Sequence, residues 1–80
     1  MSSSAHAVVA LRLVATLAHQ SELIRCRAQI LGAAGSHMRW KSPATQAFAA
    51  ELESVLAALN RCAAHFDSAA EEIYRLAVLA

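Results

Sequence analysis

Apolar residues recur in the second half of the chain in alternating steps of four and three. The series is Phe48, Leu52, Val55, Leu59, Cys62, Phe66, Ala69, Ile73 and Leu76. This spacing keeps every member near one side of an α-helix, in the pattern of a coiled-coil seam. A flanking row seven residues apart, Ala49, Leu56, Ala63, Ala70 and Ala77, widens that side and is mostly small, so another helix can approach closely. The pattern predicts a long helix at about residues 43–79.

The start of this helix is predicted by its first two residues. Ser42 is a good N-cap, because its hydroxyl can accept a bond from a free backbone N–H of the first turn. Pro43 at the first helical position loses no hydrogen bond.

The first half predicts another helix, at about residues 5–33, capped by Ser3 or Ser4. One apolar stripe is Ala10, Leu13, Leu17, Ser21, Ile24, Ala28 and Leu31, and a second apolar set is Val9, Leu11, Val14, Leu23 and Ile30. A helix with apolar groups on more than one side requires more than one neighbour. Gly35 suits a left-handed cap, so we expect a turn at about residues 34–42.

These elements predict an all-α fold: a single domain, residues 1–80, folded as an antiparallel two-helix hairpin. Two helices bury only the stripes that face each other, so a hairpin this apolar leaves a second apolar face in water. We therefore expect a dimeric four-helix bundle, formed with itself or with a second small helical hairpin. The residues expected in the helix and dimer interfaces are Leu13, Leu17, Ile24, Leu31, Phe48, Leu52, Val55, Leu59, Phe66, Ile73 and Leu76.

The two cysteines are expected to be buried apolar thiols. A hairpin that turns near residue 38 places Cys26 opposite residue 51 and Cys62 opposite residue 15. At about 1.5 Å of rise per residue, their sulfurs would lie more than about ten ångströms apart, beyond disulfide reach.

Charge is sorted along the chain although its sum is only +1. Residues 1–42 carry five basic groups against Glu22, a balance of +4, and residues 43–80 carry Arg61 and Arg75 against five acidic groups, a balance of −3. The small total argues against a nucleic-acid partner. The division favours a basic helix lying beside an acidic one and bears on partner choice more than on binding energy.

No constellation of residues indicates catalysis. His6, His19, His37 and His65 are scattered without metal-ligand spacing, and no phosphate loop or nucleophile motif is present. We expect no cofactor, no metal site and no enzymatic activity.

No segment is expected to cross a membrane. The apolar run 7–18 is too short and is interrupted by Arg12, so we expect no stable membrane insertion. No basic side chain precedes it, which argues against a cleavable signal peptide.

The turn carries a family resemblance. Trp40-Lys41-Ser42, followed by Pro43-Ala44-Thr45-Gln46-Ala47-Phe48, resembles the Trp-x-Gly turn of the WXG family, small helical hairpins of bacterial type VII secretion. The resemblance covers the whole chain in layout, but its specific motif is a few residues long. It implies a protein that acts by protein–protein contact, as a secreted substrate or as the escort of a larger secreted partner. It also implies a cytoplasmic location before export without a cleavable signal.

Two departures from the family pattern leave an alternative open. Ser42 stands where the family has Gly, and Tyr74 is followed four residues later by Val78 rather than by the acidic residue of a Tyr-x-x-x-Asp/Glu export signal. The resemblance then implies that a partner supplies the signal or that the protein is not exported. The alternative is a cytoplasmic helical dimerisation or adaptor module unrelated to secretion.

Overall fold

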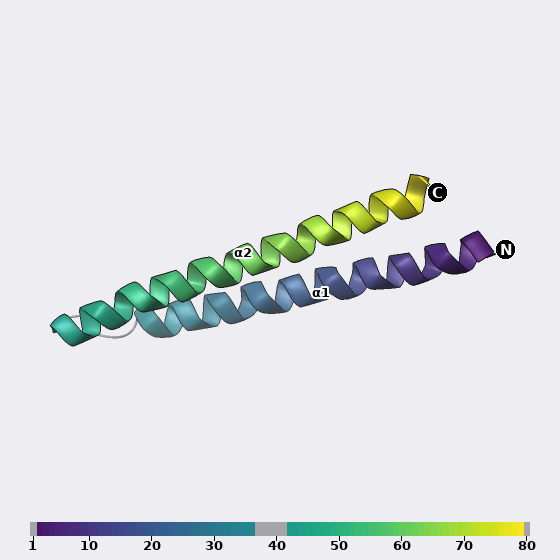
Figure 1. The fold of residues 1–80 in the computed structure, drawn as a ribbon. Helices are drawn as coiled ribbons and strands as arrows, with labels where there is room; N and C mark the ends of the chain where they lie inside the picture. Colours follow the sequence, from purple (N-terminus) through teal and green to yellow (C-terminus); the bar gives the residue numbers. More distant parts are fainter. Residues whose placement is uncertain (1, 37–41, 80) are drawn as a thin grey trace.

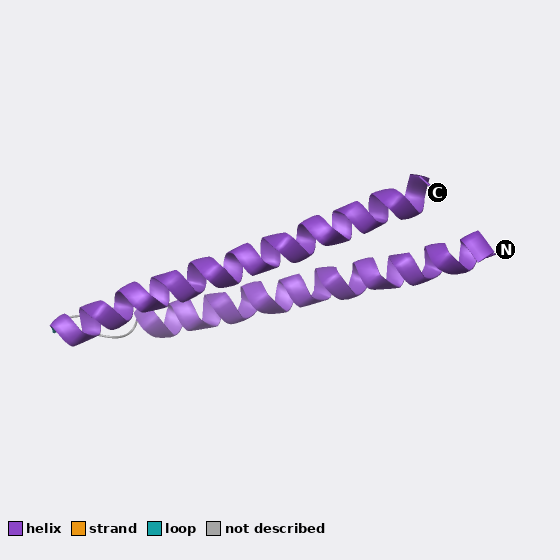
Figure 2. Cartoon of the chain, in the orientation of Figure 1, coloured by secondary structure: helices purple, strands orange, loops and turns teal. Residues whose placement is uncertain are grey.

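The chain is a hairpin of two long antiparallel helices, seen in a computed structural model that describes residues 2–36 and 42–79. Helix α1 spans Ser2–Ser36 and helix α2 spans Pro43–Leu79 (Figure 1). All regular secondary structure in the described residues is helical, as Figure 2 shows. The predicted all-α hairpin is therefore confirmed. The predicted turn motif lies partly outside the described residues, since Trp40 falls between the two ranges.

Helix α2 has the predicted bounds, whereas α1 is longer than predicted at both ends. It begins at Ser2, so Ser3 and Ser4 lie inside the helix rather than ahead of it, and the predicted cap at one of them is wrong. The left-handed cap predicted at Gly35 is also wrong, because Gly35 lies inside α1 and no described glycine has a positive φ. Gly35 is buried against α2, and such packing supports helix in a residue of low intrinsic propensity.

The two helices are offset along their common axis. Figure 1 shows α2 beginning beyond the end of α1 at the turn and ending short of the start of α1 at the other end. The long axis of the molecule is 64 Å, more than the roughly 55 Å that either helix reaches alone at 1.5 Å per residue. The Ser21 hydroxyl bonds to the carbonyl oxygen of Ala63, which places residue 21 opposite residue 63. A turn near residue 38 predicted residue 56 at that level, so the prediction was wrong by seven residues.

Small residues line the contact between the helices. The rows that meet are spaced by seven on both sides, Ala7, Val14, Ser21, Ala28 and Gly35 on α1 and Ala77, Ala70, Ala63, Leu56 and Ala49 on α2, and all ten are buried or half-buried. With residue 21 opposite residue 63, each member of one row lies opposite the member written in the same place of the other row. Every such pair contains at least one Ala, Gly or Ser, so the backbones can approach closely. We call this contact the small-residue seam.

The cysteines differ from the prediction in burial and in level. Cys26 and Cys62 are both free thiols and both exposed, so they are not the buried groups expected. In the observed register Cys62 lies opposite residue 22, within four residues of Cys26, rather than opposite residue 15. The axial separation used to exclude a disulfide was therefore wrong. The helical spacing points Cys26 away from α2, five residues beyond Ser21 of the seam, and this direction keeps the thiols apart.

Helix α1 differs from the prediction in its potential to span a membrane. By length and composition, the part from Ala5 to Ser36 is long and apolar enough to cross a bilayer, and little of it is buried in the hairpin. The length argument behind the prediction was wrong, because it considered only the run 7–18 and one Arg12 leaves a longer stretch predominantly apolar; the predicted absence of stable membrane insertion stays a prediction. The core helix of a soluble protein and a signal sequence can have the same length and composition, so this property alone assigns no location.

Candidate interaction surface

A polar cluster lies at the middle of the small-residue seam. Ser21 is fully buried, and its hydroxyl donates to the carbonyl oxygen of Ala63 at 3.2 Å. The guanidinium of Arg25 donates to the same hydroxyl oxygen at 2.7 Å and contacts a carboxylate oxygen of Asp67 at 2.7 Å. No buried side-chain nitrogen or oxygen in the described residues lacks a hydrogen-bond partner. The cluster therefore ties α1 to α2 without leaving a buried polar group unsatisfied.

The cluster also lowers the pKa of the Asp67 carboxyl group. The hydrogen-bonded guanidinium of Arg25, with a further contribution from the nearby Ser21 hydroxyl, holds the pKa of Asp67 below its usual value, against a smaller opposing effect of desolvation. The Arg25 and Asp67 side chains are each nearly half exposed, so solvent screens much of this ion pair. The main consequence of the ion pair is geometric, because Arg25 and Asp67 lie within reach of each other in only one axial register of the two helices.

The ion pair marks one broad side of the hairpin as polar and leaves the other apolar. Arg25 and Asp67 each follow a small-residue seam position, Ser21 or Ala63, by four residues. Ile24 and Phe66 follow the same two positions by three residues, so they lie on the opposite edge of the seam. One broad side of the hairpin therefore carries the Arg25–Asp67 pair, and the other carries large apolar side chains.

The residues predicted for the helix and dimer interfaces fall into two groups. Six are half-buried at the contact between the helices: Leu17, Ile24, Leu52, Leu59, Phe66 and Ile73. Five are exposed: Leu13 by 46%, Leu31 by 40%, Phe48 by 50%, Val55 by 47% and Leu76 by 64%. The predicted coiled-coil series on α2 is thus divided. The row from Ala49 to Ala77, which was expected only to flank the series, forms the α2 side of the small-residue seam. The series from Phe48 to Leu76 lies beside this row.

The exposed group gathers on the apolar side of the hairpin. Val55 lies four residues before Leu59 and Leu76 lies three after Ile73, which places both on the edge that carries Phe66. Leu31 lies seven residues after Ile24, and Leu13 lies four before Leu17, on the corresponding edge of α1. We call the surface formed by Leu13, Leu31, Val55 and Leu76, with the large residues between them, the apolar face.

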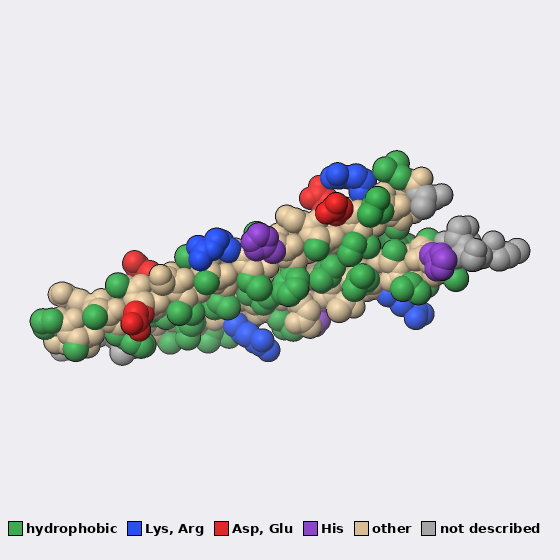
Figure 3. Space-filling view, viewed as in Figure 1, with side chains coloured by type: hydrophobic (Ala, Val, Ile, Leu, Met, Phe, Trp, Pro, Cys, Tyr) green, Lys and Arg blue, Asp and Glu red, His purple; other side chains and the backbone are tan. Residues whose placement is uncertain are grey.

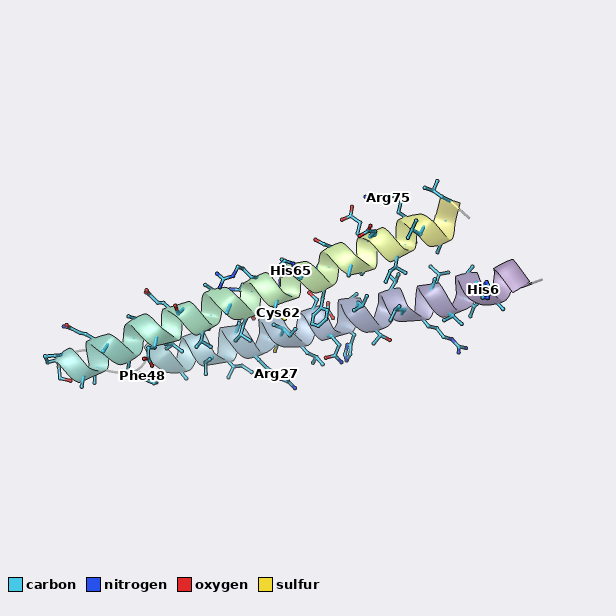
Figure 4. All side chains as sticks on the ribbon, in the orientation of Figure 1. His6, Arg27, Phe48, Cys62, His65 and Arg75 are labelled. Atoms are coloured by element: carbon cyan, nitrogen blue, oxygen red, sulfur yellow. The ribbon has the colours of Figure 1, made fainter. Side chains whose placement is uncertain are left out.

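Figure 3 shows one face of the hairpin with its side chains coloured by type. On the face drawn in Figure 3, hydrophobic side chains form a band along the line where the helices meet, and most charged side chains lie toward the outer edges. Figure 4 shows Arg27 and Arg75 extending outward from opposite edges of the hairpin. The surface exposes a long apolar band bordered by charge, which is the arrangement of a helical protein–protein interface.

The start of α2 is closed by a reciprocal cap. The Ser42 hydroxyl accepts a bond from the backbone N–H of Thr45 at 3.2 Å, and the Thr45 hydroxyl accepts one from the backbone N–H of Ser42 at 3.0 Å. This is a capping box in which Thr replaces the usual Glu or Gln. The predicted N-cap at Ser42 and first position at Pro43 are confirmed. Trp40, the third residue predicted for this turn motif, lies outside the described residues.

A shallow hollow lies between the helices near the turn. It is lined by Gly32, Gly35, Ser36, Ala49, Leu52, Glu53 and Leu56. A methyl group added at Gly32 would meet the Leu56 side chain at 3.7 Å, an ordinary van der Waals distance. Among the residues that the structure describes, no group of three or more His, Cys, Asp or Glu could hold a metal ion.

The cluster of Ser21, Arg25 and Asp67 was not predicted from the sequence. Its signal was present, because a serine interrupts the apolar stripe of α1 and opposite charges each follow a seam position by four residues. The observed register was needed to bring the two positions together.

Comparisons with protein-family models, with curated proteins and with solved structures found no match to this chain.

Proposed function

We propose that this chain is a WXG-like protein associated with type VII secretion, which acts by protein–protein contact as a substrate or as the escort of a larger secreted protein. The observation that carries the proposal is the apolar face, which runs along a hairpin of two long helices and lies open to solvent. The face has the character of an unfinished four-helix bundle, in which a second hairpin supplies the missing layer.

The total surface of the chain supports an obligatory partner. The chain exposes 6114 Å², whereas a folded monomer of the same mass, 8.5 kDa, is expected to expose about 4,700 Å². The excess, roughly 1,400 Å², is larger than the ~800 Å² that each partner buries in an interface of standard size. A bundle of two hairpins would remove the excess, so we propose a dimer, formed with a second copy or with another small hairpin.

The link to secretion is supported by the turn and the layout. Two helices of similar length flank the segment with Trp40, and α2 begins at Ser42-Pro43 as the resemblance requires. Ser42 replaces the family's Gly, and its cap shows that Ser is compatible with the helix start at this position. We propose a cytoplasmic location before export, without a cleavable signal peptide.

The second candidate function is a cytoplasmic dimerisation or adaptor module unrelated to secretion. It is favoured by Val78, which stands four residues after Tyr74 where an acidic export signal would be expected. Both candidates use the apolar face, and they differ only in whether the assembly leaves the cell.

Two experiments test the two parts of the proposal separately. Light scattering of the purified protein should give a mass of about twice 8.5 kDa or more, alone or after mixing with a candidate hairpin partner. A monomer under all these conditions would overturn the assembly. For export, the culture medium is assayed for the protein with and without type VII secretion components and a neighbouring WXG-like gene. Repeated absence from the medium, with no binding to that partner, would leave only the adaptor function.

A further inference from the structure

We infer that the hairpin is a two-register switch, in which Arg25 pairs with Asp67 in the observed arrangement and with Glu53 in a second one. In the second register α2 is displaced along α1 by seven residues, about 10 Å, so that residue 56 lies opposite residue 21. Displacement of one packed helix along another is a known type of conformational switch. The inference concerns a single chain and is therefore independent of the proposed dimer.

The small-residue seam fits both registers. Its rows repeat every seven residues on both helices, so a displacement of seven brings each α1 member opposite the next position of the α2 row. The displaced pairs are Gly35–Ser42, Ala28–Ala49, Ser21–Leu56, Val14–Ala63 and Ala7–Ala70. Every pair still contains at least one Ala, Gly or Ser. Leu56, the one large member of its row, lies opposite Ala28 in the observed register and opposite the similarly small Ser21 in the second.

The large apolar side chains beside the seam also fit both registers. On α2 these side chains recur every seven residues, at Leu52, Leu59, Phe66 and Ile73. In the observed register Ile24 of α1 lies between Leu59 and Phe66, and in the second register it lies between Leu52 and Leu59. Leu17 likewise moves from between Phe66 and Ile73 to between Leu59 and Phe66. Apolar burial at these two positions therefore does not choose between the registers.

The hydrogen bond of Ser21 does not choose strongly either. Its acceptor is a backbone carbonyl oxygen, that of Ala63. Leu56 offers a carbonyl oxygen at the equivalent position one heptad earlier, so the same bond is available after the displacement. The choice of register therefore depends on contacts between side chains of the two helices, and the ion pair of Arg25 is such a contact.

Arg25 has an acidic residue within reach in each register. Arg25, Glu53 and Asp67 all follow a seam position by four residues, so they lie on the same edge of the seam. In the observed register residue 25 lies opposite residue 59, and its guanidinium contacts Asp67 at 2.7 Å. Glu53 then lies about 9 Å along the axis in the other direction. In the second register residue 25 lies opposite residue 52, beside Glu53, and Asp67 lies about 22 Å away along the axis. The ion pair is exchanged rather than lost.

The free-energy difference between the registers is small. The Arg25 and Asp67 side chains are each nearly half exposed, and ion pairs of this kind contribute little. Since the seam fits both registers, the observed one is favoured by a population ratio on the order of ten. A partner that prefers the second register by a similar factor is enough to shift the equilibrium.

The chain between the helices is long enough for both registers. Ser36 lies opposite residue 48 in the observed register and opposite residue 41 in the second, so Ser42 lies about 9 Å or about 2 Å from it along the axis. Packed helices lie about 8–10 Å apart, so the connection spans at most about 13 Å. Six residues reach about 20 Å, which is sufficient in both cases.

The displacement changes what the open end of the hairpin exposes. In the observed register residue 79 lies opposite residue 5, so α1 accompanies α2 to its end. In the second register Ser2 lies opposite residue 75, and Leu76, Val78 and Leu79 extend beyond α1. The apolar face spans both helices, so a partner bound across it distinguishes the registers. Binding at that face is thereby coupled to presentation of the last turn of α2.

Distances within one chain measure the register. Cys26 and Cys62 are replaced by Ser, and a spin label is attached at Ala15→Cys on α1. The second label is attached at Ala47→Cys or Val78→Cys, both exposed positions of α2. Labelled protein is diluted with excess unlabelled protein, so that only distances within a chain contribute. In the observed register the axial separation should be about 33 Å to residue 47 and about 14 Å to residue 78. In the second register these values become about 22 Å and about 24 Å.

Two charge reversals on the same edge should act in opposite directions. Asp67→Lys places a like charge beside Arg25 in the observed register only, and it should increase the displaced population about three- to tenfold. The separation from residue 15 to residue 47 then shortens while that to residue 78 lengthens. Glu53→Lys is the matched control, because it places the like charge beside Arg25 in the second register only, and it should keep the distances of the parent protein.

Three outcomes would overturn the inference. Parent distances retained in Asp67→Lys would mean that the ion pair does not choose the register. Equal displacement in Asp67→Lys and Glu53→Lys would remove the exchange between the two acidic residues. A lengthening of both distances in Asp67→Lys would mean that the helices separate rather than slide. Each of these results leaves the proposed assembly intact, since that is measured by the mass of the unlabelled protein.

Discussion

The Ser21 hydroxyl donates to the carbonyl oxygen of Ala63, 42 positions away, at 3.2 Å across the hairpin. A side chain as short as serine reaches a backbone atom of the opposite helix only where the helices lie very close. Ala63, itself fully buried, allows that approach because its methyl group leaves the carbonyl accessible. The contact therefore reports both the closeness of the helices and their relative axial position.

Replacing Ser21 tests how much this contact stabilises the hairpin. Ser21→Ala removes the bond to Ala63 and one partner of Arg25, and we expect it to lower the free energy of unfolding by about 1 kcal/mol. Ser21→Leu should lower it further, by about 1–3 kcal/mol, because the larger side chain forces the helices apart. Urea unfolding at one fixed protein concentration measures both effects. Ser54→Ala, at an exposed position of α2, is the control, and equal losses in Ser21→Ala and Ser54→Ala would contradict the role of the seam.

Acid should selectively weaken the Arg25–Asp67 link. Because the folded-state pKa of Asp67 lies below its unfolded value, its contribution is fully present above the unfolded pKa of about 3.9 and is lost as the pH falls through the lower folded pKa. Asp67→Asn lacks this contribution, so the difference in melting temperature between the parent protein and the variant should shrink below about pH 4. Glu71→Gln, which removes only an exposed pair within α2, is the control and should show a smaller change. A difference that stays constant from pH 7 to pH 3 would contradict the coupling.

The cap at Ser42 can be tested by two substitutions. Ser42→Ala leaves the Thr45 backbone N–H without its acceptor and should lower stability by about 1 kcal/mol. Ser42→Gly, which restores the Trp-x-Gly form of the turn, should lower it by only a few tenths of a kcal/mol, since Gly is a tolerated N-cap. Thermal unfolding followed by circular dichroism compares them. Equal destabilisation by Ser42→Ala and Ser42→Gly would contradict this prediction. It would mean that the lost hydroxyl alone, and not the backbone conformation at residue 42, accounts for the loss of stability.

The heptad pattern predicted the helices but not their register, for a physical reason. Sliding α2 by seven residues replaces Ala63 with Leu56 opposite Ser21 and keeps the same rows in contact, so apolar burial changes little. The groups that distinguish the two registers are Ser21, Arg25 and Asp67, and a pattern of apolar positions does not include them. Capping residues acted locally, which is why the start of α2 was predicted correctly. The division of the α2 series between the seam and the apolar face depends on the direction of α1, which no local pattern contains.

Gly32 offers a stabilising substitution. It lies inside α1 with a helical backbone, and an added methyl group would lie 3.7 Å from the Leu56 side chain without a clash. Gly32→Ala should therefore raise the free energy of unfolding by up to about 1 kcal/mol, the difference in helix propensity, with a small further gain from contact. Chemical unfolding provides the measurement. A loss of stability would show that the helices need to lie closer here than the structure places them.

Asp substitutions at matched positions distinguish the role of the apolar face from that of the contact between the two helices. Val55→Asp places a charge on the face while leaving the contact between α1 and α2 intact, so the chain should stay helical but lose its dimer. Two copies of the charge enter each interface, and the dissociation constant should rise at least about tenfold. Ala57→Asp adds the same charge at an exposed position away from the face and should keep the dimer. Phe66→Asp, at a half-buried residue of the contact between the helices, should instead destabilise the hairpin itself. Sedimentation together with circular dichroism distinguishes the three results. Should Val55→Asp remain as dimeric as Ala57→Asp, the partner would have to bind on the polar side, where Arg25 and Asp67 meet.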